Sequence, residues 1–197
     1  SDFRRTRARI QPYIRRTPVV ETDWPGLHLK LENLQYTHSF KIRGAFSRML
    51  ELRRAGDQRA VLTVSAGNHG QAVARAASVL GRSCTVVIPQ AAPKAKVDAI
   101  RRYGIDLVIE GSNYDEAEAH TLRLAEEGNR WVFVSPYNDR DVILGQGTLA
   151  LELIEQQPDL THVIVPIGGG GLAAGVGAAM KRLRPSVRII GAQADAS

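Results

Sequence analysis

The sequence has little of what several classes of protein require. Its single cysteine, Cys84, excludes an internal disulfide and suits a reducing compartment, so we expect a cytoplasmic location. Only 6% of the residues are aromatic, and no stacking platform for single-stranded nucleic acid is visible. No apolar segment of the secretory type occurs near the start, so we expect no signal peptide.

Long apolar runs are also missing, with one exception. Residues 163–180 carry no charge over 18 positions, which superficially resembles a membrane span. Six glycines and Pro166 lie in this run, and they favour a strand, a turn and a helix over one continuous helix. We therefore expect a buried turn there and no interaction with a membrane.

The charge balance is basic, which raises the question of nucleic acid binding. The formal net charge is +6, and six of the first sixteen residues are arginine. Ile10, Tyr13 and Ile14, however, suggest a short helix that lies on the protein with its basic side in solvent. We therefore expect no nucleic-acid partner.

Hydrophobic patterning alternates along the chain between segments typical of strands and segments typical of helices. Apolar residues make up 44% of the sequence, enough for a sizeable core. We expect strands at 27–31, 60–64, 83–88, 105–109, 131–134, 162–166 and 187–191, and helices at 41–54, 69–80, 94–103, 114–126, 142–156 and 172–183. This order predicts the α/β class, with open, twisted parallel sheets and helices on both faces.

Lysine is scarce, and one lysine stands out by its position. Only 5 of the 26 basic residues are lysine, and Lys41 lies in residues 39–45 (SFKIRGA), where a predicted helix begins. A primary amine that loses its proton through partial burial can form a Schiff base with an aldehyde, which arginine cannot do under ordinary conditions. A solvated lysine near a helix start is the ordinary alternative, so Lys41 needs support from elsewhere in the chain.

A polar turn follows the predicted strand at 60–64. Residues 65–71 (SAGNHGQ) lead into the next helix, and Asn68 offers both an amide donor and a carbonyl acceptor. Open α/β sheets bind ligands at the carboxyl ends of their strands, which is where this turn lies. The alternative is an ordinary helix N-terminus with Ser65 near the cap.

Four consecutive glycines, Gly168 to Gly171, follow the predicted strand at 162–166. They cost backbone entropy and pack poorly, so they make sense where a ligand must approach the main chain. The following helix directs its N-terminal N–H groups at the loop, which predicts an anion site, most simply for a phosphate. A dinucleotide site is weakly supported, because the glycine spacing differs from the fingerprint of such sites.

An amine, a polar turn and a phosphate loop together describe a site for a phosphorylated aldehyde. In these motifs the chain resembles the serine/threonine dehydratase family (threonine ammonia-lyases and serine racemase-like enzymes) of fold type II pyridoxal-phosphate enzymes. The matching segments occur in the family's order and cover nearly the whole chain: 29–35 (LKLENLQ), 39–45 (SFKIRGA), 65–71 (SAGNHGQ), 145–148 (GQGT) and 168–172 (GGGGL).

The resemblance implies roles for single residues. Lys41 would hold pyridoxal 5'-phosphate as a Schiff base and then serve as the proton-transfer base, and Asn68 would contact the ring hydroxyl. The implied cofactor-binding residues are Phe40, Lys41, Asn68, Gly168, Gly169, Gly170, Gly171 and Leu172. The turn implied to receive the substrate carboxylate through main-chain N–H groups comprises Ser65, Ala66, Gly67, Asn68 and His69.

Several of these segments have structural interpretations as well. Phe40 is nearly as well explained as an ordinary core aromatic. Residues 145–148 are interpreted as a structural motif that opens a helix and positions backbone. Tyr137 and Asn138 are expected where the chain crosses between domains, and the sequence does not decide whether either touches the cofactor.

The reaction implied by the resemblance is α,β-elimination of water from threonine or serine, which yields a 2-keto acid and ammonia. Two alternatives stay open: an amino-acid racemase of the same family, and an inactive truncated binding module. Racemases of the family carry a second serine where this chain has Ala66. A methyl group cannot exchange a proton, so elimination is favoured over racemisation.

Two further departures from the family pattern concern tuning and metals. His38 replaces a glycine near Lys41; it could tune the site near neutral pH, or simply be packed or solvated. Gln193 stands where some relatives place a glutamate that binds a divalent cation. Because a neutral amide is a poorer ligand for a hard cation, we expect no metal through this residue.

The resemblance also implies a two-domain organisation in a longer protein, because family members extend well beyond this length. Residues 1–59 with 139–197 would form a large, incomplete cofactor-binding domain, and residues 60–138 a small inserted domain. The site would lie between the domains, and closure over a small amino-acid substrate would exclude water. When full length, the protein is expected to be a homo-oligomer, either a dimer or a tetramer.

Overall fold

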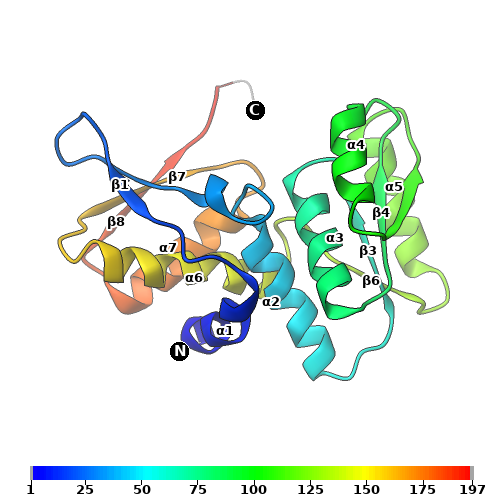
Figure 1. Cartoon of the computed structure of the whole chain (residues 1–197), viewed down its shortest axis with the longest axis horizontal. Helices are drawn as coiled ribbons and strands as arrows, with labels where there is room; N and C mark the ends of the chain where they lie inside the picture. Colours follow the sequence, from blue (N-terminus) through cyan, green and yellow to red (C-terminus); the bar gives the residue numbers. More distant parts are fainter. Residues whose placement is uncertain (1, 196–197) are drawn as a thin grey trace. The chain divides into compact units, whose positions relative to one another are not determined.

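A computed structural model describes residues 2–195 and confirms the α/β class (Figure 1). The chain divides into two compact units, and each is described by itself. Unit 1 comprises Ser1–Ser47 and Tyr137–Ser197, and unit 2 comprises Arg48–Pro136. That these units are the functional domains of the protein stays a prediction.

Unit 2 contains a four-stranded sheet in which every pairing is parallel. Its strand order is β5-β4-β3-β6, with the bounds β3 (Ala60–Val64), β4 (Cys84–Ile88), β5 (Asp106–Ile109) and β6 (Trp131–Phe133). The two central strands, β3 and β4, are apolar along almost their whole length, as strands covered on both faces should be.

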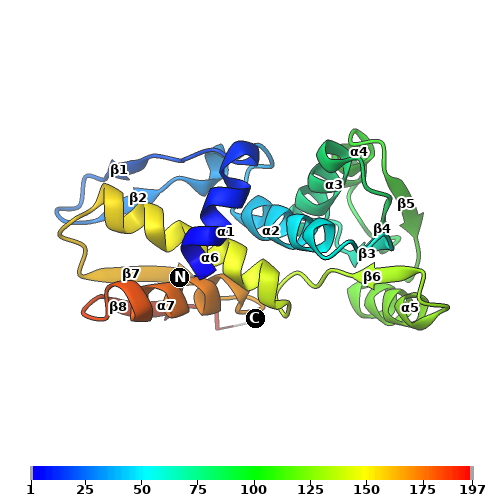
Figure 2. The same ribbon diagram turned by 90° about the horizontal axis from the view of Figure 1, so that it is seen from below.

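Helices cover both faces of this sheet. Figure 2 shows α3 (Asn68–Leu80) and α4 (Lys94–Arg101) on one face and α5 (Tyr114–Glu126) on the other. Leu62, Val64, Val87 and Ala117 form a buried core cluster between the sheet and α5. The carboxyl end of β3 leads directly into the turn that begins α3.

Unit 1 contains two pairs of strands and the helices that carry the predicted cofactor residues. The strands β1 (Val19–Glu21) and β2 (His28–Lys30) pair antiparallel, whereas β7 (His162–Pro166) and β8 (Arg188–Ala192) pair parallel. The helical elements that begin in unit 1 are α1 (Asp2–Ile10), η1 (Gln11–Tyr13), η2 (Glu32–Leu34), α2 (Lys41–Arg54), α6 (Arg140–Gln156) and α7 (Gly171–Leu183).

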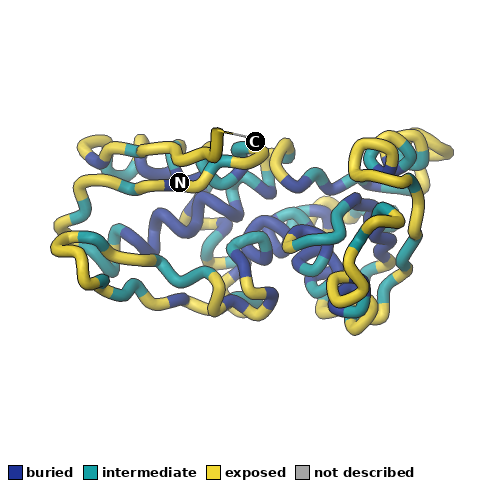
Figure 3. The backbone as a smooth tube through the Cα atoms, turned by 90° about the horizontal axis from the view of Figure 1, so that it is seen from above, coloured by how far each residue is buried: buried dark blue, intermediate teal, exposed yellow. Residues whose placement is uncertain are grey.

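The helix α6 is the centre of unit 1. Ten of its 17 residues are buried, and it packs against α7 and β7 in one cluster with Val165, Val176 and Met180. Figure 3 shows buried backbone inside each unit and exposed backbone along the loops. Within the described residues, no helix combines the length and the apolar composition that crossing a membrane would require.

Candidate active site

Lys41 is the first residue of α2 and is half-buried. Its Nζ lies 5.3 Å from the centroid of the Phe40 ring, so Phe40 forms part of its surroundings. The Arg43 N–H donates to the Phe40 carbonyl at 3.0 Å and closes the first turn of the helix. Burial disfavours the ammonium form and lowers the pKa of Lys41, which makes this amine easier to deprotonate than a solvated one.

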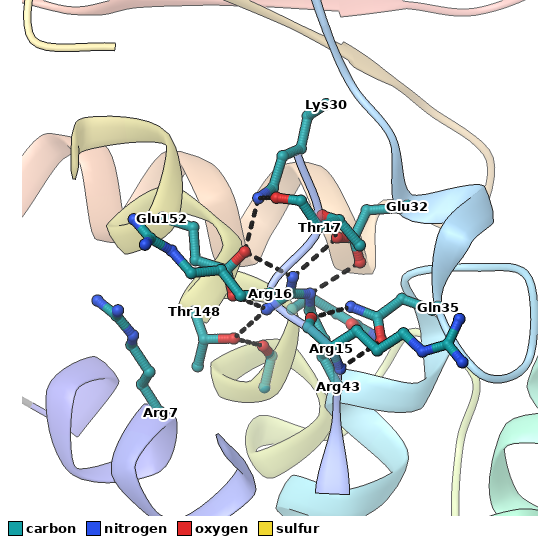
Figure 4. A network of polar contacts seen from close by, with 12 residues as sticks. Arg7, Arg15, Arg16, Thr17, Lys30, Glu32, Gln35, Arg43, Thr148 and Glu152 are labelled. Atoms are coloured by element: carbon teal, nitrogen blue, oxygen red, sulfur yellow. Dashed lines mark hydrogen bonds and ion pairs between the residues drawn. The ribbon is translucent and has the colours of Figure 1, made fainter. Parts of the chain in front are cut away.

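A buried network of charges anchors α2 two residues after Lys41 (Figure 4). The Arg43 side chain is 0% exposed. Its guanidinium donates to both Glu32 oxygens at 2.8 Å and to the two Glu152 oxygens at 2.7 and 3.0 Å. Lys30 Nζ donates to Glu152 at 2.6 Å and to the Thr17 carbonyl at 2.7 Å. The network joins the N-terminal segment, α2 and α6.

Two cations and two carboxylates balance each other in this network. Burial, the largest single influence, penalises the charge on Arg43, but the hydrogen bonds and the charges of Glu32 and Glu152 together outweigh that penalty and raise the pKa of the guanidinium. Burial is also the largest influence on Glu152 and opposes its charge, yet the hydrogen bonds and the charges of Arg43 and Lys30 together leave the pKa of this carboxyl below its ordinary value. The charged forms therefore stabilise one another where an unpaired charge would be costly.

The motif at 29–35 contributes two charged side chains to this network. Lys30 and Glu32 are network members, as described. Gln35 clamps the main chain of Arg15, accepting from its N–H at 3.0 Å and donating to its carbonyl at 2.7 Å. These contacts with residues distant in sequence give the polar residues of the motif a structural role.

The glycine loop connects β7 to α7. Gly170 caps the helix with a φ of +82°, a conformation that L side chains rarely adopt. The Ala174 N–H donates to the Gly170 carbonyl at 2.8 Å, and the N–H groups of the first turn have no partner inside the helix. A Cβ placed on Gly168 or Gly170 would meet nothing within 4 Å, so one side of the loop is open.

Tyr137 closes the other side of the loop. A Cβ on Gly169 would lie 2.4 Å from Cδ1 of Tyr137, and a Cβ on Gly171 would lie 3.0 Å from its Cα. Only glycine allows the loop to lie this close to Tyr137. No local sequence pattern indicates this contact, because its partners are more than 30 positions apart.

The turn at 65–71 belongs to unit 2 and begins α3 at Asn68, with Gly67 as the cap. The Gly67 N–H donates to Ser65 Oγ at 3.1 Å, and the Ser65 N–H donates to the Val87 carbonyl at 3.1 Å. A Cβ on Gly70 would lie 2.1 Å from the Ser65 carbonyl oxygen. The turn is thus tight and fixed to the sheet, with Asn68 exposed at its end.

His69, one of the predicted substrate residues, has its side chain buried in unit 2. Its Nε2 lies 3.1 Å from the Val134 carbonyl oxygen, which also accepts from Thr63 Oγ1 at 2.8 Å. Because a carbonyl oxygen only accepts, Nε2 carries the proton. The side chain holds the end of β6 against α3, and a substrate role for His69 through its main chain stays a prediction.

Comparison with known proteins decides the family. A family model described as pyridoxal-phosphate dependent enzyme matches residues 10–197. The chain belongs to the family of pyridoxal-phosphate-dependent enzymes. The resemblance inferred from the motifs is therefore confirmed, together with the cofactor on which the family depends.

Among the similar proteins, three carry threonine or serine in their names. The catabolic L-threonine dehydratase TdcB of Staphylococcus aureus (strain USA300) is 40% identical over 201 residues, which cover 98% of this chain and 58% of that protein. Maize serine racemase superposes with a TM-score of 0.90 at 39% identity, covering 97% of this chain and 60% of that one. Threonine deaminase isoform 2 of Solanum lycopersicum gives a TM-score of 0.89 at 34% identity, covering 98% and 60%. The chain thus spans about six tenths of the length of these relatives.

The residues present fit the cofactor of this family. An open loop of backbone N–H groups at a helix N-terminus is suited to a phosphate, and Gly168 and Gly170 leave room for one. A half-buried amine with a lowered pKa is suited to an aldehyde. Lys41 and the glycine loop belong to unit 1, and Asn68 belongs to unit 2.

Substitution of Gly169 by alanine should destabilise the cofactor-free protein by about 1 to 3 kcal/mol, because the new methyl group overlaps Tyr137. Gly168→Ala is the matched control: its methyl group meets nothing within 4 Å. It should leave the stability unchanged or raise it by about 0.4 to 1 kcal/mol. Urea unfolding of both variants measures the difference, and equal stabilities would contradict the Tyr137 contact.

One expectation about the motif at 145–148 is wrong. It does not open a helix, because α6 begins at Arg140 and the motif lies inside it. Asp139 caps this helix by accepting from the N–H groups of Asp141 and Val142. The cap signal therefore lay upstream of the glycines, and the glycines serve contacts between helices.

His38 has a backbone conformation that favours glycine, the residue that the family resemblance implies at this position. Its φ is +56°, in the left-handed region, and its Nδ1 lies 3.4 Å from the Asn33 carbonyl oxygen. The side chain is exposed. Its influence on the chemistry of the site stays a prediction.

Proposed function

We propose that the protein carrying this chain removes water from threonine or serine and releases a 2-keto acid and ammonia. The observation that carries the proposal is the half-buried amine of Lys41, placed at the start of a helix that a buried charge network holds. The similarity to threonine dehydratases and deaminases supports the choice of reaction, and a small amino acid is accordingly the proposed substrate.

Bound pyridoxal phosphate supplies an aldehyde for amines and an electron sink for the charge left when the substrate Cα loses its proton. In this proposal Lys41 Nζ holds the cofactor between turnovers. In its neutral form this amine would accept the Cα proton of the substrate. Its lowered pKa keeps a larger neutral fraction available near pH 7 than a solvated lysine has.

The other residues bind and orient. The N–H groups of the glycine loop and of the start of α7, from Gly168 to Leu172, would hold the phosphate. The main-chain N–H groups of residues 65–69 would hold the substrate carboxylate, and Asn68 would donate to the ring hydroxyl. Phe40 would form a wall beside Lys41, consistent with the 5.3 Å between its ring centroid and Nζ.

Release of 2-oxobutanoate from threonine, and of pyruvate from serine, tests the proposal in the full protein that carries this chain. We expect both keto acids, each matched by one equivalent of ammonia. A protein that binds the cofactor yet releases neither product from either amino acid would be a binding module, and the proposed reaction would be wrong.

Racemisation is the second candidate, because a serine racemase and an aspartate racemase are 39% and 37% identical to the chain. Ala66 argues against it, since its methyl group offers no proton to the second face of the substrate. Chiral analysis of serine during turnover separates the two reactions. Exchange between enantiomers faster than pyruvate release would favour the racemase.

The lowered pKa of Lys41 predicts how its reactivity depends on pH. The neutral amine is the nucleophile, and burial disfavours the ammonium. Acetylation of Lys41 in the cofactor-free protein should therefore rise with pH and level off with a midpoint below the ordinary value of 10.5. Competitive labelling against Nα-acetyl-lysine, read by mass spectrometry, measures both midpoints, and a Lys41 midpoint at or above that of the free amino acid would contradict the burial argument.

Assembly and location belong to the proposal as well. We infer a homo-oligomer, a dimer or a tetramer, for the full protein and a cytoplasmic location. The single cysteine supports the second inference.

A further inference from the structure

Two glycines of α6, two positions apart, contact two different helices. A Cβ on Gly145 would lie 2.5 Å from the Arg43 carbonyl oxygen and 2.6 Å from Gly44 Cα, both in α2. A Cβ on Gly147 would lie 2.7 Å from the Gly175 carbonyl oxygen in α7. The backbone of α6 therefore touches the backbones of α2 and α7 directly.

The contacts are reciprocal, which shows that glycine is needed on each helix. A Cβ on Gly44 would lie 2.5 Å from Gln146 Nε2 and 2.8 Å from Val142 Cγ1. A Cβ on Gly175 would lie 2.4 Å from the Ile143 carbonyl oxygen and 2.7 Å from the Gly147 N. Each glycine inside a helix costs about 1 kcal/mol relative to alanine, so four at two crossings are a considerable sacrifice of helix stability.

We call the contact of α2 with α6 and the contact of α7 with α6 the two crossings. Each crossing lies about one helical turn from residues predicted to bind the cofactor. Gly44 is three residues after Lys41, where α2 begins, and Gly175 is four residues after Gly171, where α7 begins. Contacts between backbones have no side-chain rotamers that could adjust. The crossings thus fix where each helix begins relative to α6.

A second set of contacts holds the α2 crossing in register. Arg43, next to Gly44, donates to Glu152 of α6 at 2.7 and 3.0 Å. The Gly44 N–H donates to Gln146 Oε1 at 3.3 Å. The helix α2 can therefore neither slide along α6 nor turn on it without breaking buried polar contacts.

We propose that α6 is a spacer that sets the distance between the Lys41 amine and the phosphate-binding glycine loop. Gly145 is the positioning residue for the amine, and Gly147 with Gly175 positions the loop. The cofactor is rigid, so its aldehyde and its phosphate must be bound at the same time. A displacement of α2 on α6 would therefore weaken binding of the aldehyde and preserve binding of the phosphate, and a displacement of α7 would do the reverse. This inference rests on the proposed cofactor-binding roles of Lys41 and the loop.

Two probes, each carrying one end of the cofactor, test the spacer in the full protein. Pyridoxal has the aldehyde without the phosphate, and 4'-deoxypyridoxine 5'-phosphate has the phosphate without the aldehyde. Gly175→Ala should weaken binding of the phosphate probe about tenfold or more, and leave borohydride trapping of pyridoxal on Lys41 within about twofold. Gly145→Ala should slow the trapping by about tenfold or more and spare the phosphate probe.

Gly177→Ala is the matched control, because Gly177 also lies in α7 but a Cβ there would meet nothing within 4 Å. It should change neither probe. Parallel weakening of both probes in the folded Gly145 and Gly175 variants, or an equal effect of Gly177→Ala, would overturn the spacer. If the wild-type protein binds neither probe, the assigned cofactor-binding roles fail, and that outcome is distinct from failure of the spacer alone.

Milder variants keep the test decisive where overpacking prevents folding, as judged by thermal unfolding. Phe3→Ala with Gly147→Ala removes the ring that a Gly147 Cβ would meet at 2.4 Å and leaves the α7 overlap. Gln146→Ala with Gly44→Ala removes the amide that a Gly44 Cβ would meet at 2.5 Å and leaves the Val142 overlap. The first double variant should weaken binding of the phosphate probe, as Gly175→Ala does. The second should slow trapping of pyridoxal, as Gly145→Ala does. Failure of every variant at both crossings to fold would assign the glycines to stability alone and overturn the proposal.

Discussion

Replacement of Arg43 by methionine should lower the free energy of unfolding by about 3 to 5 kcal/mol, the usual cost of removing one partner from a buried ion pair. The substitution leaves the carboxylates of Glu32 and Glu152 without their shared cation, and their side chains are only 11% and 4% exposed. Urea unfolding of the cofactor-free protein at neutral pH measures the loss. Because Arg43 lies two residues after Lys41, cofactor attachment should weaken as well.

The control for this prediction is an arginine of the same helix on the surface. Arg54 pairs with Glu51, and its side chain is 68% exposed, so Arg54→Met should change stability by less than about 1 kcal/mol. A loss of similar size in both variants would contradict the account of the buried network.

At acid pH, the difference in the free energy of unfolding between Arg43→Met and the wild-type protein should become smaller. In the wild type the folded-state pKa of Glu152 is lowered, so this group contributes stability above its ordinary value of 4.5 that is lost as the pH falls through the lower folded value. Without Arg43, burial penalises the carboxylate, and protonation relieves that penalty. The deficit of Arg43→Met measured at pH 7 should therefore shrink as the pH falls below 4.5.

Replacement of Lys41 by alanine should reduce release of keto acid by about a thousandfold or more, because both cofactor attachment and the proton-accepting amine are lost. The glycine loop is untouched, so the protein should still bind 4'-deoxypyridoxine 5'-phosphate. Steady-state turnover of threonine at saturating cofactor measures the first effect, and titration of that phosphate the second.

Lys94→Ala is the control for loss of a lysine as such. This side chain is 87% exposed and pairs with Asp98 on α4. Turnover should stay within about twofold of the wild type, as expected for a surface substitution away from special features. Comparable losses in both lysine variants would show that Lys41 has no particular role.

Sequence patterns predicted best what depends on neighbouring residues. The strands at 60–64 and 162–166 and the helices at 41–54 and 114–126 are confirmed at both ends. Their apolar periodicity is strong, and they are bordered by turns or polar segments. Other helix ends differed by one or two residues, as at α6, where the cap at Asp139 was not recognised.

Elements that depend on distant partners were harder to predict. The strand β1 was missed because only its pairing with β2 makes three residues extended, and this antiparallel pair is an exception to the predicted parallel order. The first helix, α1, begins far ahead of the short helix expected near Ile10. This helix is rich in arginine, so its apolar side, which packs on α6 through Phe3, was not recognised from the sequence.

The candidate site shows the same limit. Lys41, the turn at 65–71 and the glycine loop were predicted from local composition and from a family resemblance. The partners of Arg43, and the glycine pairs that place α2 and α7 on α6, join positions up to about a hundred residues apart. A single sequence carries no signal that pairs Gly44 with Gly145, so only the fold explains why both are glycine.

The most direct test of the account is reduction of the cofactor-loaded protein with borohydride, followed by peptide mapping. Lys41 is one of 5 lysines, so chance alone does not favour it. The account predicts a pyridoxyl group on the peptide that contains Lys41 and on no other. A stable pyridoxyl group on a different lysine, with Lys41 unmodified, would contradict it.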